Sequence, residues 1–425
     1  MFNIRSVIVA GAVACALPCA VHAVDWTQFR GPNHDGTSPE TILTNWPATG
    51  LREVWKHPMK DGFSGITIGG GKAFTLVQRD VEGAGQEVCV ALDADSGKEL
   101  WAAPLGVAGY DGGGDHGAPG NDGGDGPRST PSYDDGKVYT YSARMVLKCL
   151  DASTGQQVWS CDIIKEHAGH NIHWESAASP LIEGDLVFVA GGGPGEALLA
   201  FNKNDGHNVW KGQDDKMTQS SPVAATILGE RQVIFFTQKG LVSVVPATGA
   251  VLWRFPFRFS TATAISPVVC GDVVYCSAGY GVGSSACKIS RSNGGFTAAE
   301  MWHQPASVLA NHWSTPVYSD GYLYGISGQA KFGIAPLVCV EVATGRIMWT
   351  ESGFGPGGCT LVGGDVLVLS DAGDLVLVKA TPTSYQEVAR THVLAGKCWN
   401  SASVSNGRIY ARSTREGVSL DVSAQ

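Results

Sequence analysis

A short element, a glycine followed four residues later by a tryptophan, recurs along this 425-residue chain and constrains its fold more than any other feature. Five copies keep this spacing, and a looser sixth runs from Gly294 to Trp302. Neighbouring tryptophans of the series lie 43 to 58 residues apart. Repeats of that length are typical of the blades of a β-propeller. The tryptophans are Trp101, Trp159, Trp210, Trp253, Trp302 and Trp349.

Each repeat can be read as two β-hairpins. The run Glu87–Leu92 is apolar and alternating, as in a half-buried strand. Asp93 to Gly97 has the composition of a tight turn, in which the aspartate binds its own backbone and glycine takes a positive φ. The tryptophan then falls on the outer strand, where its ring can seal the neighbouring blade. An upstream hairpin, such as Ser266–Tyr275, completes four strands.

The two ends of the chain decide the number of blades. A seventh hairpin runs from Cys359 to Leu369, although its outer strand has Ala389 where tryptophan is expected. An eighth set, Trp399 to Val422, lacks a fourth strand, and Arg52–Trp55 is a spare strand at the other end. We therefore predict an all-β, eight-bladed propeller of four-stranded antiparallel blades, closed by the N-terminal strand so that no sheet edge is exposed. A seven-bladed ring, with the degenerate unit as a spacer, is the alternative.

The N-terminus predicts export. The apolar run Val7 to Ala20 is too short to span a membrane, and Val21-His22-Ala23 has the residues of a cleavage site. We expect a cut after Ala23 and a periplasmic or secreted protein without a transmembrane segment. Lipidation at Cys19 stays open, although Pro18 precedes it. The predicted divisions are a signal peptide (1–23), an N-terminal extension (24–50) and the propeller (51–425).

Composition excludes some partners and leaves cysteine pairing open. The formal charge is −9 and no cluster of lysine and arginine occurs, so we expect no nucleic-acid partner. Eleven cysteines minus Cys15 and Cys19 leave nine, an odd number, in the mature chain. Cys270 and Cys276 flank a turn, but their pairing cannot be assigned from the sequence. Most of the nine read as small buried residues on strands.

The repeat Ala/Cys-x-Asp-x-x-Thr/Ser-Gly-x-x-x-Trp resembles the tryptophan-docking motif of quinoprotein dehydrogenases, and the resemblance covers residues 50–425. The wider family is the pyrroloquinoline-quinone-like (PQQ-like) propeller repeat, which includes the non-catalytic propeller lipoprotein of the outer-membrane β-barrel assembly machinery. Local matches at Trp26–Pro32, Gly126–Pro131 and Gly396–Asn400 resemble a branch of exported bacterial proteins. The resemblance implies the fold much more than an activity. It assigns a structural docking role to Trp55, Trp101, Trp159, Trp210, Trp253, Trp302 and Trp349.

Unusual residues concentrate in the loops that lead into the blades. These loops share one face of an antiparallel propeller with the mid-blade loops, whereas the repetitive turns share the other. Several place a tryptophan beside polar groups near the central channel, as in a pocket for a planar or polar ligand. Alternatively, the tryptophans only wedge between strands. The candidate ligand-binding residues are Arg128, His170, Asn171, His173, Trp174, Glu175, Asn311, His312, Trp313, Lys397, Trp399 and Asn400.

Two segments contain residues of metal-binding type. His170, His173 and Glu175 suit zinc or copper, but two residues three apart on an extended strand point to opposite faces. A glycine-rich insertion carries aspartates that suit calcium, but their spacing matches no calcium loop, and a solvated loop is favoured. We therefore expect no metal site. The weak candidates in the insertion are Asp111, Asp115, Asp122 and Asp125.

The catalytic markers of the resembling dehydrogenases are missing. Those enzymes carry two adjacent cysteines and hold calcium with Glu, Asn and Asp, whereas this chain has no Cys-Cys pair and no Cys-x-x-Cys-His haem motif. Glu175 with Asn311 or Asn400 could imitate calcium ligands. We predict a monomeric, non-catalytic binding or scaffold protein for an envelope or extracellular protein or glycan. The alternative is an oxidoreductase using PQQ with calcium, or another cofactor, of the quinoprotein alcohol or sugar dehydrogenase type.

Overall fold

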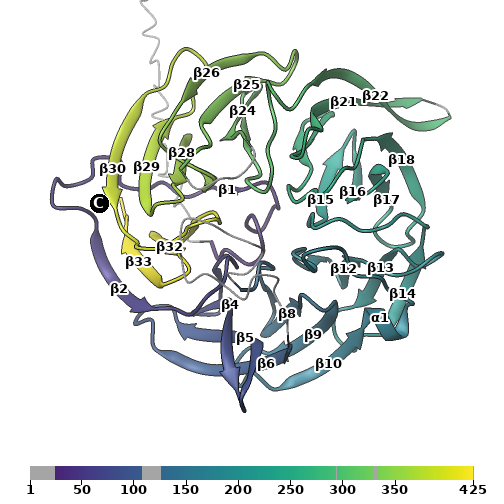
Figure 1. Ribbon diagram of the computed structural model, residues 1–425, viewed down its shortest axis with the longest axis horizontal. Coiled ribbons are helices and arrows are strands. Elements are labelled where there is room, and N and C mark those ends of the chain that lie inside the picture. Colours follow the sequence, from purple (N-terminus) through teal and green to yellow (C-terminus); the bar gives the residue numbers. More distant parts are fainter. Residues whose placement is uncertain (1–23, 108–125, 293, 329–332, 425) are drawn as a thin grey trace, which may run out of the picture.

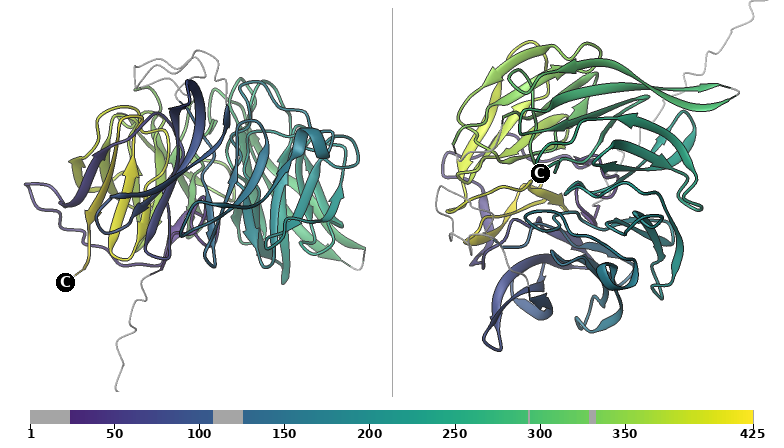
Figure 2. Two further views of the ribbon diagram at one scale, coloured as in Figure 1. Left: turned by 90° about the horizontal axis from the view of Figure 1, so that it is seen from below. Right: turned by 45° about the vertical axis from the view of Figure 1, so that its right-hand side comes forward.

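Eight β-sheets form a ring in the computed structural model, which describes residues 24–107, 126–292, 294–328 and 333–424 (Figure 1). The chain passes around the ring once, and each blade has four antiparallel strands. In seven blades these strands follow in sequence order from the axis outwards, and in the eighth the outer strand comes from the N-terminal part of the chain. Seen from the side, the strands run between the two faces of the ring (Figure 2). The prediction of eight blades is confirmed, because the degenerate seventh unit is a complete blade and not a spacer.

The first four blades lie between residues 67 and 256. Blade 1 contains β3 (Thr67–Gly69), β4 (Lys72–Val81), β5 (Ala84–Asp93) and β6 (Glu99–Val107), and blade 2 contains β7 (Ser132–Asp134), β8 (Lys137–Tyr141), β9 (Val146–Asp151) and β10 (Gln157–Asp162). The short helix α1 (Ile163–Glu166) follows. Blade 3 contains β11 (Leu181–Glu183), β12 (Leu186–Ala190), β13 (Leu198–Asn202) and β14 (Asn208–Gly212), and blade 4 contains β15 (Val223–Ile227), β16 (Glu230–Thr237), β17 (Gly240–Val244) and β18 (Val251–Pro256).

The last four blades complete the ring. Blade 5 contains β19 (Val268–Cys270), β20 (Val273–Ala278), β21 (Gly283–Ser292) and β22 (Gly295–Gln304), and blade 6 contains β23 (Val317–Ser319), β24 (Tyr322–Ile326), β25 (Leu337–Glu341) and β26 (Ile347–Glu351). Blade 7 contains β27 (Gly358–Val362), β28 (Asp365–Leu369), β29 (Asp374–Lys379) and β30 (Glu387–His392). Blade 8 contains β31 (Ser403–Ser405), β32 (Arg408–Arg412), β33 (Glu416–Asp421) and, as its outer strand, β2 (Arg52–Pro58).

The ring closes through strand β2, as predicted. It pairs antiparallel with β33, from Arg52 opposite Asp421 to Pro58 opposite Glu416. The first and last strands of the propeller therefore belong to one blade. This pairing protects the sheet edge that an open ring would expose.

Six of the seven tryptophans with a predicted docking role join their blade to the next one in the same way. The indole Nε1 donates to a backbone carbonyl in the turn of the following blade, at 2.7 to 3.0 Å. The ring covers the turn glycine in five of the six pairs: a Cβ added to Gly97 would lie 2.6 Å from Trp55 Cδ2, and Gly97 has a φ of +69°. Glycine is therefore required there by both space and conformation. The pairs are Trp55 with Ala94, Trp101 with Ala152, Trp159 with Lys203, Trp210 with Pro246, Trp302 with Val342 and Trp349 with Thr381.

Trp253 is the exception. Its Nε1 donates to Gln232 Oε1 of its own blade at 2.7 Å. The following blade has a long hairpin, β21 and β22, in place of the compact Asp-x-x-Thr-Gly turn. The usual carbonyl acceptor is therefore replaced by a buried amide side chain.

Apolar side chains fill the spaces between the blades, and strand β28 illustrates the pattern. Val366 and Val368 pack into a cluster with blade 6, whereas Leu367 and Leu369 pack into a cluster with blade 8. Both faces of the blade are buried at β28, which explains the nearly continuous apolar sequence of this strand. All nine cysteines among the described residues are buried and free, so Cys270 and Cys276 do not form a disulfide.

The N-terminal extension crosses the centre of the ring (Figure 1). Its strand β1 (Thr37–Ser38) pairs parallel with β27, with Thr37 opposite Leu361. Backbone hydrogen bonds also join the carbonyls of Trp26 and Thr27 to the amides of Ile68 and Tyr133 in blades 1 and 2. We name residues 24–42 the axial segment. It connects the inner strands of blades that are far apart in the sequence.

Candidate functional site

A cavity of about 550 Å³ lies on the axis of the propeller. Its floor is the axial segment, through Trp26, Phe29, Arg30 and Gly36, and its walls are the residues that lead into the inner strands. The volume falls within the range of small-ligand pockets. Because these walls come from the loops that lead into the blades, the cavity lies on the face where the unusual residues were predicted to gather.

The floor is held by a buried arginine. Arg30 is 5% exposed, and its guanidinium donates to the carbonyls of Thr315 at 3.0 Å, Pro316 at 2.8 Å and Asp35 at 2.7 Å. Burial lowers the pKa of Arg30 to about 10. The neighbouring Gln28 exchanges two hydrogen bonds with the backbone of Ile182 in blade 3. The motif Trp26–Pro32 is thus an anchor for the axial segment.

Six aromatic residues form a continuous series of ring contacts around the cavity, and we name them the aromatic rim. Trp174 stacks on Tyr280, with centroids 6.0 Å apart, and Tyr280 contacts the edge of His312 at 4.9 Å. The series continues from His312 through Trp313 to Trp399, with centroid distances of 4.7 and 4.6 Å. It ends at Phe63, which stacks on Trp399 at 5.1 Å and 18°. These residues come from blades 1, 3, 5, 6 and 8, so the complete ring assembles the rim.

Two rim residues have an unusual backbone conformation. Trp174 and Tyr280 have φ values of +65° and +53°, in the left-handed region that large side chains avoid. Glu175, next to Trp174, also has a positive φ, of +63°. Such strain persists only where the surrounding structure enforces it, and it concentrates at functional sites.

Several buried polar atoms around the cavity have no hydrogen-bond partner among the described residues. They include both donors and acceptors: Trp399 Nε1 is a donor, and Asn400 leaves both its Nδ2 and its Oδ1 unsatisfied. Burial lowers the pKa of His312 to about 4, so its imidazole is neutral near pH 7. Buried polar groups are rarely left unsatisfied, and a ligand could satisfy these. The remaining unsatisfied atoms near the cavity are His312 Nδ1, Ser314 Oγ and Gln219 Oε1.

Among the described residues, the cavity is lined by basic but not by acidic side chains. Its described lining contains Arg30 and Arg128 and no aspartate or glutamate, whereas the whole chain has a formal charge of −9. Arg128 donates through Nη1 to the carbonyl of Trp174 and so connects blades 2 and 3 at the rim. Lys397 is fully buried, with its Nζ 5.0 Å from the ring centroid of Trp399. The described lining therefore supplies no carboxylate that could attract a cation.

The structure brings half of the predicted site residues together at the cavity and shows others that the sequence analysis missed. Tyr280 and Phe63 were missed because each stands alone between glycines or small residues, without a neighbouring histidine or tryptophan. The floor was missed because nothing in Trp26–Pro32 indicates which blades it contacts. The predicted residues in the lining are Arg128, Trp174, His312, Trp313, Trp399 and Asn400.

The other predicted residues lie outside the lining. His170 and His173 are exposed, and Asn171 Nδ2 donates to the carbonyl of Ala143 at 2.8 Å. Glu175 forms an ion pair with Arg144 at 2.9 Å. Asn311 is 2% exposed and bridges Tyr275 and Ile326, so its contacts are structural. Lys397 is fully buried, with its Nζ over the ring of Trp399.

The metal candidates gain no support from the geometry. Within the described ranges, no group of three or more histidine, cysteine, aspartate or glutamate side chains could hold an ion. The four aspartates of the insertion, Asp111, Asp115, Asp122 and Asp125, lie outside the described residues.

Residues 84–351 match the sequence family PQQ_2, described as outer membrane protein assembly factor BamB. The chain belongs to this family. Among the described residues, no helix is long and apolar enough to cross a membrane.

Curated relatives of the BamB-like chain include proteins with different names. It is 25% identical over 237 residues to an outer membrane protein assembly factor BamB from Shewanella oneidensis, covering 53% of this chain and 56% of that protein. It is 26% identical over 268 residues to a tetrathionate hydrolase from Acidithiobacillus ferrooxidans, covering 56% of this chain and 48% of that protein. The chain thus spans about half the length of these relatives.

A solved structure shows the same fold. The quinohemoprotein alcohol dehydrogenase from Comamonas testosteroni superposes with a TM-score of 0.63 at 14% identity, covering 94% of this chain and 81% of that one. At this identity the likeness concerns the fold alone. The propeller fold therefore occurs in both assembly factors and enzymes, so the function of this chain has to be argued from its cavity.

Proposed function

We propose that this chain is an exported, non-catalytic propeller that binds a glycan in the axial cavity. The aromatic rim with its unsatisfied polar atoms carries the proposal. Flat aromatic faces cover the apolar faces of sugar rings, and hydroxyl groups both donate and accept hydrogen bonds. Trp399 Nε1, Asn400 and Ser314 Oγ would satisfy such hydroxyls at the cavity wall.

The charged residues of the lining refine the expected ligand. Arg128 donates to the carbonyl of Trp174 at the rim, and Arg30 donates to backbone carbonyls at the floor. With no carboxylate in the described lining, a glycan bearing a carboxylate or another anionic group would meet no repulsion there. We therefore expect the cavity to accept acidic sugars as well as neutral ones.

The quinoprotein alternative fits the cavity poorly. Calcium is held by oxygen ligands that are mainly carboxylates, and the described lining supplies none. Glu175, which was considered as a calcium ligand, pairs with Arg144. Asn311, which was also considered as a calcium ligand, holds blades 5 and 6 together. The chain also lacks the adjacent cysteines of the dehydrogenases.

Intrinsic fluorescence tests the proposal. The chain would be titrated with neutral, amino-sugar and uronic-acid oligosaccharides, in wild type and in Trp313→Ala, Trp399→Ala and Trp46→Ala. Trp46 is a matched control, since it lies outside the cavity and bonds the carbonyl of Leu43. We expect both rim variants to lose about tenfold or more in affinity, equivalent to about 1.4 kcal/mol, and the control to bind normally. Binding that both rim variants retain would contradict the site.

Two further arms separate the alternatives. Incubation with PQQ and calcium should give no stoichiometric binding of PQQ. Tight binding of PQQ would support the oxidoreductase hypothesis instead. A protein partner, which the name of the assembly factor relatives suggests, would be recovered from envelope fractions by crosslinking. If rim substitutions abolished such a crosslink and no sugar bound in the titration, the ligand of the cavity would be a protein and not a glycan.

A further inference from the structure

Glu40 is a buried carboxylate that faces the first residue of the predicted mature chain. It is 3% exposed, and its oxygens accept the backbone amides of Asn406 at 2.6 Å and Gly407 at 2.8 Å. The amide nitrogen of Val24 donates to the same carboxylate at 3.2 Å. Val24 is fixed from the other side, because its carbonyl accepts from Ser405 Oγ at 3.0 Å.

The carboxylate of Glu40 has no positively charged partner among the described side chains. Among the described residues, no lysine, arginine or histidine side chain forms an ion pair with Glu40. A buried ionised carboxylate is costly unless it is paired with a positive charge. Three backbone amides supply hydrogen bonds but no charge. The group at the third amide, Val24, is the one that changes chemically if the signal peptide is removed after Ala23.

We infer that cleavage after Ala23 creates the missing cation, and that the new α-ammonium group of Val24 pairs with Glu40 to lock the axial segment into the ring. Hydrolysis of the Ala23–Val24 peptide bond consumes one water, leaves a carboxylate on the released peptide, and leaves an amino group on Val24 that binds a proton near neutral pH. The nitrogen already lies at hydrogen-bond distance from Glu40 Oε1. The ion pair needs little rearrangement of either residue.

The lock would act on the ligand cavity. Trp26, Phe29 and Arg30, which form its floor, follow Val24 directly in the chain. Glu40 lies beyond the other end of the floor and fixes the turn between β31 and β32 in blade 8. Pairing Val24 with Glu40 therefore closes the axial segment into a loop whose two ends meet at one carboxylate. Removal of the signal peptide would thus complete the cavity floor as well as release the chain.

The surrounding charges are compatible with this pairing. Asp25, the next residue, accepts from the amide of Gly70 and from Asn406 Nδ2, both at 3.1 Å. The two turns that bond Asp25 and Val24 are followed by Lys72 and Arg408, and Arg408 pairs with Asp95 at 2.7 Å. Asp25 and Glu40 together make the neighbourhood of the new amino group negative. Negative neighbours favour the protonated form of an amino group, so we expect its pKa to lie above the ordinary value of about 8.

The test compares chains with different N-termini, without any ligand, so that its outcome is independent of the proposed glycan site. One chain begins at Val24 and the other retains Ala23, each with native Glu40, Glu40→Gln or the exposed control Glu82→Gln. At pH 7 we expect the Val24 chain to unfold at a midpoint about 2 °C or more above the extended chain. The difference should vanish with Glu40→Gln and persist with Glu82→Gln. Equal midpoints with native Glu40 would overturn the inference.

A pH series needs no substitution and covers the case in which Glu40→Gln does not fold. An amino group whose pKa is raised by folding stabilises fully below its unfolded pKa of about 8, and the stabilisation is lost as pH rises through the folded pKa. The advantage of the Val24 chain should therefore be present at pH 7 and absent near pH 11. An advantage that is unchanged at pH 11 would show that charge is not its cause. Intact mass of the exported protein should correspond to a chain beginning at Val24, and another N-terminus would also overturn the inference.

Discussion

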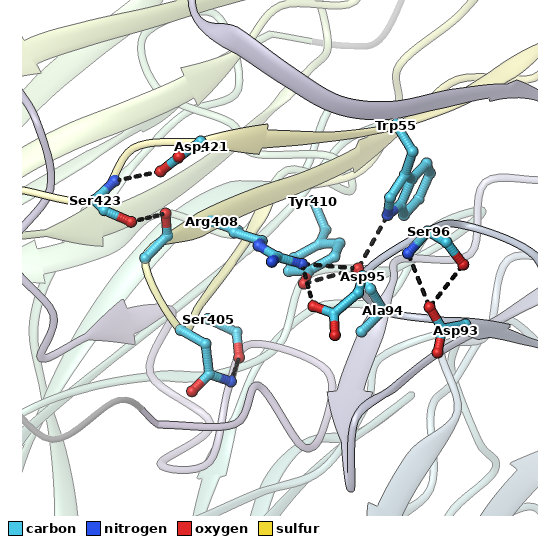
Figure 3. Close-up of polar contacts among 12 residues, drawn as sticks. Trp55, Asp93, Ala94, Asp95, Ser96, Ser405, Arg408, Tyr410, Asp421 and Ser423 are labelled. Atoms are coloured by element: carbon cyan, nitrogen blue, oxygen red, sulfur yellow. Dashed lines mark hydrogen bonds and ion pairs between the residues drawn. The ribbon is translucent and has the colours of Figure 1, made fainter.

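The indole Nε1 of Trp55 donates to the carbonyl of Ala94 at 3.0 Å and so joins the last blade to the first (Figure 3). Two more donors from blade 8 reach the same oxygen, Arg408 Nη1 at 3.1 Å and Tyr410 Oη at 3.4 Å. Five other docking tryptophans meet acceptor carbonyls in the same way and Trp253 does not, but the Trp55 junction also joins the two ends of the propeller chain. Its strength should therefore influence the stability of the whole ring.

Trp55→Ala should lower the free energy of unfolding by about 3–5 kcal/mol, because the ring is 4% exposed and packs against Ile66, Ile68 and Tyr410. Trp55→Phe keeps an aromatic ring but loses one hydrogen bond, and should cost about 1 kcal/mol from that bond alone. Urea denaturation followed by circular dichroism measures both. A loss with Trp55→Ala no larger than that of an exposed substitution such as Leu100→Ala would contradict this account of ring closure.

Arg30→Met should cost about 3–5 kcal/mol, since it leaves the buried carbonyls of Thr315 and Pro316 without their donor. Arg30→Lys should recover little of this, because one ammonium cannot reproduce the fork of a guanidinium. Arg79→Lys is the matched control: Arg79 forms an exposed pair with Glu99, and its replacement should change stability by less than about 0.5 kcal/mol. Limited proteolysis should cleave the axial segment faster in Arg30→Met. Equal cleavage of the variant and wild type would mean that Arg30 does not anchor the segment.

Acid should destabilise the protein through two buried histidines. Desolvation lowers the pKa of both His34 and His312 from 6.5 to about 4. A depressed histidine pKa means that stability is complete above about pH 6.5 and is lost as pH falls towards 4, because only the unfolded state then binds the proton. Each histidine accounts for roughly 3 kcal/mol of this loss. In urea titrations, His34→Gln and His312→Gln should each flatten the decline between pH 6.5 and 4, whereas the exposed His207→Gln should not. A decline that neither variant alters would have another origin.

Thiol reagents should leave the native protein unmodified. All nine described cysteines are buried and free, and burial raises the pKa of Cys149 and Cys359 to about 12. Maleimide at pH 7.5 should add no mass to the folded chain and nine adducts after unfolding in urea. Ser96→Cys, at an exposed turn, provides a positive control with one adduct in the folded state. Fewer than nine adducts in the unfolded mature chain would indicate a disulfide.

The fold was predictable because its signal is local and repeated. Each Asp-x-x-Thr-Gly turn with its tryptophan is specified within about ten residues, and the unpaired Arg52–Trp55 strand implied the closure that β2 and β33 form. The degenerate unit shows the limit of the motif. Blade 7 forms without a docking tryptophan at Ala389, because the alternation of Val366 to Leu369 buries both of its faces.

The site was predictable only in part, because its geometry depends on contacts between distant segments. Loops rich in tryptophan and histidine identified Trp174, Trp313 and Trp399, but their neighbours could not be inferred from the sequence. Arg30 contacts Thr315, which lies 285 residues away, and no periodic pattern indicates that contact. The unusual φ of Trp174 likewise turns the chain so that Glu175 meets Arg144 and lies outside the cavity lining.

Among the described residues, the axial segment forms the floor of the cavity, so we expect a ligand to enter and leave on the side of the aromatic rim. A ligand must leave the cavity by the opening through which it entered, so the rate of its release depends on the rim and not on passage through the molecule. For the same reason we expect that a polymer does not thread the ring or slide along it. If the cavity binds a glycan as proposed, we expect it to receive the terminus of the polymer and so to distinguish chain ends from chain interiors even when their sugars are identical.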